Sequence, residues 1–470
     1  MYLFTLLPSA NSCDPVQMEV ISQNKTKQDM RGRNMLSAIA HLALFCWCQV
    51  LVYYDRGIIS GMVDHITQEV PGAESKFLAG FLGGMFMVGF MVASPLFVRL
   101  SQISRSWKLY AIIIGLGALA VSAVLTYFAW QSFIALLMLR MVSGAGEAAF
   151  CSLAAPIIDE SAPVGKKSLY VGLYFMFIYV GFGAGSASCF VFDSWESGRI
   201  LFLGEASLVV ICMAVFGLLR NRFQVPESNR EETGGLMNQL KVVITKPVFL
   251  LLSLGYGAFF FAFGAFAFWT PTVIKHLYPD SKGVADLGFG AVTIITGIIG
   301  TAAGGMLMEV VSKRLSSRKS LSSFAMDSIQ VLAGVVICAV LVFSGMLFTF
   351  PAVFSPNVYI FLLFFAVGTL LLFSTTAPVN IAIMYSVPPA LKSQAMAVST
   401  VLSHLLGDFP SPFVIGAFID GVGYKIAIVI TSAFLILPVA LWLGAGYQAK
   451  KLAQEQVDLN EPKPQTASVL

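Results

Sequence analysis

Four ionisable side chains stand out inside stretches that are otherwise apolar enough to cross a membrane. Asp55 and Arg56 lie near the end of the first such stretch, and Arg140 and Glu147 lie in the fourth. A charge at the centre of a bilayer helix costs about 2.5 to 3.5 kcal/mol, so these residues are expected to face a cavity and to find partners. A carboxyl group beside an arginine in such a cavity can bind and release a proton. The chemistry indicated is proton transfer.

The spacing of these four residues predicts which of them pair. Arg140 and Glu147 are seven residues apart, which places them on one face of a helix, about 10 Å apart along its axis. Asp55 and Arg56 are adjacent and point about 100° apart, so they cannot pair well with each other. The fourth helix runs antiparallel to the first. Cross-helix pairs of Asp55 with Arg140, or of Arg56 with Glu147, are therefore feasible.

Two interpretations of the embedded charges remain open from the residues alone. Buried pairs can simply lock helices together, or they can act in function. Gly144 and Gly146 lie between the two charges of the fourth stretch, where glycine allows a neighbouring backbone to approach closely. Four ionisable residues on two helices, together with these glycines, favour a functional role.

A second group of polar residues lies in the eleventh stretch, VLSHLLGDFPSPFVIGAFID. His404 and Asp408 are four residues apart on one helix face, and Ser403 precedes them. An aspartate beside a histidine could orient or tune the imidazole, which predicts a gating or tuning role. Alternatively, His404 bonds a backbone carbonyl and Asp408 satisfies a helix broken by Pro410 and Pro412. A metal site is not expected, because two ligands are too few.

The composition places these residues in an integral membrane protein. Of 470 residues, 57% are hydrophobic and 11% are charged, whereas a soluble domain carries about 25% charged residues. Segments long enough to span a bilayer are predicted at about 36–60, 77–98, 109–129, 132–158, 168–192, 200–220, 248–274, 286–311, 326–350, 357–385, 394–419 and 424–447.

Twelve segments divided six and six by a charged connection are the layout of the major facilitator transporters, whose halves move about a central site. We therefore predict an all-α membrane protein with that fold. The expected parts are an N-terminal tail (1–34), a six-helix half (35–220), a linker (221–246), a second six-helix half (247–448) and a C-terminal tail (449–470).

The distribution of charge predicts the orientation. Lys and Arg concentrate in the tails and in every second loop, so both termini are expected in the cytoplasm. The net charge of +4 is explained by this topology, and no nucleic-acid partner is expected. The sequence has no nucleophile–base pair, phosphate-binding loop or metal motif, so we expect no catalysis, cofactor or metal.

Three stretches carry a resemblance to a known family. YYDRGIISGMVDHI, RMVSGAGEAAFCSLAAPIIDE and LSHLLGDFPSPFVIGAFID resemble the first, fourth and eleventh helices of the Spinster family of major facilitator transporters. The resemblance implies proton-linked, alternating-access transport of a single-chain amphiphile of lysophospholipid or sphingosine 1-phosphate type. It implies proton coupling by Asp55 and Glu147, with Arg56 and Arg140 as substrate or ion-pair residues. It also implies an endolysosomal membrane, and carriers of this class usually act as monomers.

One loop departs from the family pattern. After the second helix the superfamily usually carries G-x-x-x-D-R-x-x-R, but here the loop reads SQISRSWK. Gln102 and Ile103 stand where the Asp and Arg would be. That Asp–Arg network normally stabilises one conformation of the transporter. We therefore expect the balance between the conformations of this protein, and with it the coupling, to differ from that of the family.

Other functions remain as alternatives. An organic-anion or drug efflux carrier would share the fold, and a non-transporting sensor or scaffold would use the charges for stability alone. The aromatic run FFFAFGAFAFW, residues 259 to 269, could line a lipid-tail pocket or simply face lipid.

Overall fold

The computed structural model describes residues 15–101, 105–163, 166–219, 241–316, 323–388 and 391–460, and within these ranges it contains helices and short connections but no strand. Twelve helical spans are long and apolar enough to cross a membrane, beginning with Ile39–Glu69 and ending with Tyr424–Leu452. The predicted all-α protein with twelve spans is confirmed. It is a multi-pass membrane protein.

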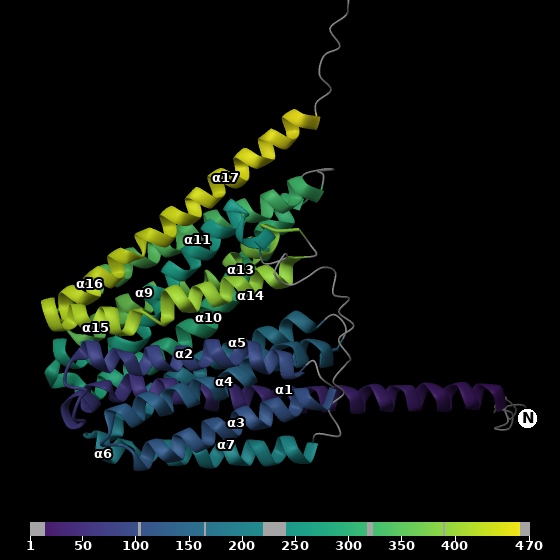
Figure 1. Ribbon diagram of the computed structural model, residues 1–470. Helices are drawn as coiled ribbons and strands as arrows, with labels where there is room; N and C mark the ends of the chain where they lie inside the picture. Colours follow the sequence, from purple (N-terminus) through teal and green to yellow (C-terminus); the bar gives the residue numbers. More distant parts are fainter. Residues whose placement is uncertain are drawn as a thin grey trace, which may run out of the picture.

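Six of the twelve spans, from Ile39–Glu69 to Trp195–Leu218, form the first half, whose helices lie together in the bundle (Figure 1). Helix α1 packs against α5, α2 packs against α4, and α3 packs against both α4 and α7. The elements are α1 (Pro15–Glu69), α2 (Lys76–Ser101), α3 (Arg105–Phe128), α4 (Phe133–Ser161), α5 (Lys167–Ser188), the single turn η1 (Cys189–Val191), α6 (Trp195–Gly198) and α7 (Ile200–Leu219).

The second half contains six spans as well, and three of them are divided into shorter helices. The eleventh is divided by a π-helical turn, η5, that precedes Pro410 and Pro412. The elements are α9 (Pro247–Leu277), η3 (Pro279–Ser281), α10 (Lys282–Ser316), α11 (Ser323–Ala352), α12 (Val358–Phe373), α13 (Thr376–Tyr385), α14 (Lys392–Ser403), η5 (His404–Asp408), α15 (Ser411–Val422), α16 (Tyr424–Phe434) and α17 (Ile436–Asn460).

The first helix is longer than the sequence pattern indicates. We expected residues 1–34 to form a tail, but α1 begins at Pro15 and continues without a break into the span, so it projects beyond the bundle (Figure 1). Proline is favoured in a first turn because its missing N–H has no helical partner there, and residues 16–31 contain neither Gly nor Pro. Helix α17 likewise continues past residue 448, to Asn460.

The two halves meet at the end of the bundle distant from the termini and diverge toward the termini (Figure 1). Asp420 of α15 caps the start of α2: it accepts hydrogen bonds from the backbone N–H groups of Lys76 at 3.0 Å and Phe77 at 2.9 Å, and from the Ser75 hydroxyl at 2.7 Å. A carboxylate at a helix N-terminus is favoured by the unpaired N–H groups and the helix dipole. This cap joins the halves at their closed end.

Glycines set the distances between the helices of the first half. A Cβ added to Gly144 of α4 would overlap the carbonyl oxygen of Phe86 on α2, and one added to Gly146 would overlap the Gly115 carbonyl on α3. The expected close approach at Gly144 and Gly146 is therefore confirmed, and α4 is fixed between α2 and α3.

Gly144→Ala is expected to lower the free energy of unfolding by about 1 to 3 kcal/mol, because α2 and α4 must separate to admit the methyl group. Thermal unfolding in detergent measures the change. Gly172→Ala is the matched control, since a Cβ at Gly172 meets nothing within 4 Å. Equal melting temperatures for the two variants would contradict the prediction.

Candidate functional site

The centre of the first half holds a buried ion pair between α1 and α4. Arg140 donates from Nη1 to both carboxyl oxygens of Asp55, at 2.7 and 2.6 Å. The Ser143 hydroxyl, one turn further along α4, donates to the same carboxylate at 2.7 Å. Asp55 is 2% exposed and Arg140 is 3% exposed. Charge-assisted hydrogen bonds of this kind compensate for the loss of water around both ions.

A second pair joins the same two helices. Arg56 donates from Nε to Glu147 Oε2 at 3.0 Å and from Nη2 to Oε1 at 2.5 Å. The Glu147 side chain is fully buried, whereas 18% of the Arg56 side chain is exposed. Both feasible pairs from the sequence are thus present together, and Arg56 is the member of this pair that an outside group can reach.

Phe86 of α2 lies between the two pairs and was not predicted from the sequence. Its ring centroid lies 4.4 Å from the Arg56 guanidinium carbon and 4.9 Å from that of Arg140. The face of an aromatic ring attracts cations. The buried Phe86 ring therefore stabilises both arginines, and it keeps the two guanidinium groups apart without adding charge.

The four charges cancel, which defines what the site can do. When a proton binds either carboxylate, the paired arginine is left with a buried positive charge that needs a new partner. Protonation is thereby linked to rearrangement of the helices or to entry of an anion.

The polar residues of the eleventh span lie at the π-turn. His404 Nδ1 and Asp408 Oδ2 are 2.8 Å apart. The imidazole contacts the edges of two rings, with centroid distances of 5.5 Å to Phe90 of α2 and 5.7 Å to Phe260 of α9. The structure therefore pairs His404 with Asp408. The Ser403 hydroxyl instead donates to the Thr400 carbonyl of its own helix at 2.9 Å.

The two groups of polar residues face each other across the halves. His404 reaches α2 through Phe90, and Asp408 interacts electrostatically with Arg56. A change of charge near Arg56 in the first half therefore alters the electrostatic environment of Asp408 in the π-turn of the second half.

Aromatic rings from both halves gather beside the π-turn. Phe263 of α9 packs on Phe373, with centroids 5.2 Å apart, and Phe373 packs on Tyr179 of α5 at 4.4 Å. Phe260 and Phe263 are only partly buried. The predicted aromatic run thus contributes two partly buried rings, one of which contacts His404, although several of its other members are core residues.

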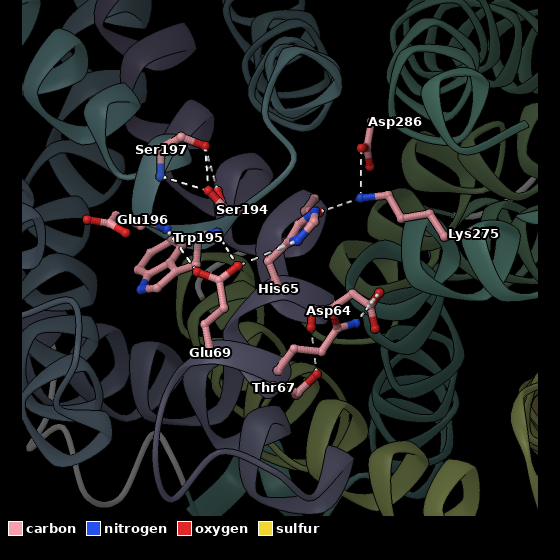
Figure 2. Close-up of polar contacts among 12 residues, drawn as sticks. Asp64, His65, Thr67, Glu69, Ser194, Trp195, Glu196, Ser197, Lys275 and Asp286 are labelled. Atoms are coloured by element: carbon pink, nitrogen blue, oxygen red, sulfur yellow. Dashed lines mark hydrogen bonds and ion pairs between the residues drawn. The ribbon is translucent and has the colours of Figure 1, made fainter.

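Polar contacts close the end of the site distant from the termini (Figure 2). Lys275 of α9 pairs with Asp286 of α10 at 2.7 Å and also donates to the Gly61 carbonyl of α1 at 2.9 Å. Asp64, one turn further along α1, pairs with Lys76 of α2 at 3.1 Å. The contact of Lys275 with Gly61 joins the two halves. The sequence pattern did not indicate it, because Lys275 lies at the predicted end of the seventh span.

Three buried acids, Asp64, Glu205 and Asp286, were not predicted from the sequence. Glu205 of α7 is 1% exposed, and its charge inside the sixth apolar stretch was a readable signal. Gln102 and Ile103, which depart from the superfamily loop pattern, lie outside the described residues. Within the ranges that the structure covers, no group of three His, Cys, Asp or Glu could hold a metal ion.

Sequence comparison agrees with this architecture. The profile of the Major Facilitator Superfamily matches residues 45–412. The chain is 31% identical to the "Probable sphingolipid transporter spinster homolog 2" of Arabidopsis thaliana over 435 residues, which covers 85% of each chain. It is 30% identical to "Protein spinster homolog 3" of Danio rerio, covering 81% of this chain and 76% of the relative.

Solved structures show the same fold. A bacterial homologue of the human lysosomal transporter Spinster, in an inward-facing and unoccupied conformation, superposes with a TM-score of 0.72 at 16% identity. The superposition covers 88% of this chain and 98% of that one. The nucleoside transporter NupG superposes with a TM-score of 0.62 at 11% identity, covering 87% of this chain and 99% of that one.

Arg140→Gln is expected to destabilise the protein by about 3 to 5 kcal/mol, because it removes one partner of a buried pair and leaves Asp55 without its cation. Arg56→Gln, the matched control, should cost less, since the Arg56 side chain is 18% exposed and that of Arg140 only 4%. Thermal unfolding of both variants in detergent measures the difference. A larger loss for Arg56→Gln would contradict this ranking.

Proposed function

The chain belongs to the Spinster family of major facilitator transporters, and we propose that it is a proton-linked carrier of a single-chain amphiphilic lipid, of sphingosine 1-phosphate or lysophospholipid type, that works by alternating access. The observation that carries the proposal is the neutral cluster of two acids and two arginines between α1 and α4. The plant relatives are named as probable sphingolipid transporters, which supports the substrate class.

Proton coupling is assigned to Asp55 and Glu147. Each is buried and each accepts two hydrogen bonds from one arginine. Protonation of Glu147 removes the charge that holds Arg56, and protonation of Asp55 removes the charge that holds Arg140. Proton binding thus makes a cation available, and proton release withdraws it.

Arg56 is assigned to the lipid head. A guanidinium group matches a phosphate with two parallel hydrogen bonds, and Arg56 is the more exposed of the two arginines. The phosphate of the substrate takes the place of Glu147 when that residue is protonated. The partly buried ring of Phe260, which contacts His404, and the ring of Phe263 beside it offer an apolar surface to the chain of the lipid.

His404 and Asp408 are assigned a gating role, with Ser403 fixing the turn that precedes them. Their π-turn contacts α2 through Phe90 and contacts α9 through Phe260. Movement between the halves must change these contacts. The pair therefore responds to the relative position of the halves.

We place both termini in the cytoplasm and the carrier, as a monomer, in an endolysosomal membrane. The distribution of Lys and Arg supports the orientation. The structural relative that is a bacterial homologue of a human lysosomal transporter supports the choice of membrane. The end closed by Lys275 and Asp420 then faces the lumen.

Glu147→Gln and Asp55→Asn are expected to abolish the pH dependence of transport while the protein remains folded, because each amide keeps the shape of the acid and cannot titrate. Uptake of labelled sphingosine 1-phosphate and lysophosphatidylcholine into proteoliposomes, with and without a proton gradient, measures the effect.

The matched control for these variants is Glu196→Gln, whose side chain is 63% exposed at the surface. It should respond to the gradient as the wild type does. If neither lipid moves in the wild type while a thermal shift shows a folded protein, the substrate class is wrong. If Glu147→Gln still follows the gradient, the assignment of the proton site is wrong.

Arg56→Lys is expected to weaken binding of a phosphate-headed lipid by about tenfold, which corresponds to about 1.4 kcal/mol, because a lysine cannot form two parallel hydrogen bonds. Competition with unlabelled lipid in the proteoliposome assay measures the affinity. Sphingosine, which lacks the phosphate, is the control ligand and should compete equally with both proteins. An equal loss for both ligands would contradict a direct role for Arg56 at the head.

A further inference from the structure

A fifth buried ionisable group lies beside the charge cluster and has no part in the steps above. Glu205 is the sixth residue of α7, is 1% exposed, and neither of its carboxyl oxygens has a hydrogen-bond partner. Asp55 and Glu147, by contrast, each accept from an arginine. A bare carboxylate in an apolar interior is strongly unfavourable. This environment accommodates the protonated acid.

The charge balance of the cluster agrees with a protonated Glu205. Asp55 and Glu147 already cancel Arg56 and Arg140, so an ionised Glu205 would add one unbalanced negative charge. After Asp55 binds a proton, the balance is reversed: one positive charge is in excess, and an ionised Glu205 would cancel it. Glu205 therefore balances the charge of the cluster in both states: it is protonated when Asp55 is ionised, and ionised when Asp55 is protonated.

The groups near Glu205 are those that opposite changes in the protonation of Glu205 and Asp55 require. Glu205 interacts electrostatically with Asp55 and Arg140, and Tyr54 of α1 also interacts with it. Arg140 pairs with Asp55 through Nη1 only, and its buried Nε has no partner. The guanidinium group thus retains a free donor in the same cluster.

Helix α3 also packs against α7, but its described ionisable side chains lie near its ends. Lys108 and Tyr110 lie in its first two turns. Tyr127 lies in its last turn, under the guanidinium group of Arg199. They leave the middle of α3 without an ionisable group to oppose Glu205.

Glu205 lies nearer the closed end of the bundle than Asp55. Glu69, the last residue of α1, accepts a hydrogen bond from the Trp195 backbone N–H at 2.8 Å, which puts the end of α1 and the start of α6 at one level (Figure 2). Asp55 is 14 residues from Glu69 and Glu205 is 10 residues from Trp195, which at 1.5 Å per residue is about 21 Å and about 15 Å. A proton that arrives from the closed end meets Glu205 first.

We infer that Glu205 is the proton donor to Asp55 on the side of the closed end, with Arg140 as the counter-charge that the two carboxyl groups share. The O–H bond of Glu205 breaks, an O–H bond forms on Asp55, and Arg140 pairs with the carboxylate that Glu205 becomes. The net charge of the interior does not change in this step. The inference rests on the proposed function, because it requires Asp55 to take up the transported proton.

A thermal double-mutant cycle tests the shared counter-charge without any transport. In Asp55→Asn, Glu205 can ionise and pair with Arg140, and Glu205→Gln imitates the protonated acid, so each single variant should lose little stability. The double variant leaves Arg140 without either carboxylate. Its melting temperature should fall by several degrees more than the sum of the single losses, and an additive result would overturn the inference.

Transport tests the donor role. Glu205→Gln should reduce gradient-driven uptake about tenfold or more, while lipid counterflow without net proton movement continues at the wild-type rate. The control is Tyr174→Phe, which removes another buried oxygen without a partner and should retain both activities. Equal gradient dependence in Glu205→Gln and wild type overturns the inference alone, whereas a wild type without gradient dependence overturns the proposed function and the donor role together.

Discussion

Charge neutrality in the membrane interior is the constraint on which the rest of the structure depends. Two acids and two arginines are buried between α1 and α4, and each acid is held by one arginine. Because burial leaves little water to stabilise a surplus charge, a proton cannot bind one acid without a second change nearby. Protonation of one acid in the cluster therefore requires a compensating change in the residues around it.

Protonation can move the helices only because the helices are packed closely around the cluster. Gly144 and Gly146 bring α4 against α2 and α3, and the approach of α2 allows Phe86 to lie against both guanidinium groups. A looser arrangement would let water screen the charges, and the coupling between protonation and structure would weaken. The glycine contacts are therefore part of the electrostatics, although they carry no charge.

The sequence predicted the features that follow from helical periodicity. Twelve spans and the pairs of Asp55 and Arg56 with α4 depend on local spacing, which a regular helix preserves. His404 and Asp408 are also paired, although a π-turn replaces the regular helix there. Phe86 could not be predicted, since one phenylalanine in an apolar helix looks like any other until the partner helix is placed. The start of α1 at Pro15 and the contact of Lys275 with Gly61 depend on where helices end, which hydropathy defines poorly.

The two halves contribute different chemistry to one site. The first half supplies the charges, whereas α9 and α12 of the second half supply the rings of Phe260, Phe263 and Phe373. An amphiphile has the same division, with a charged head at one end and an apolar chain at the other. Its two ends would therefore bind to opposite halves, so the substrate of the proposed carrier spans the interface that must move.

The closed end is joined mainly by hydrogen bonds to backbone groups and by the Asp420 cap. The Lys275–Asp286 pair lies within the second half, so it survives when the halves separate. Opening then exposes no unpaired buried charge at that end, so in the proposed carrier the barrier to movement is set at the central cluster.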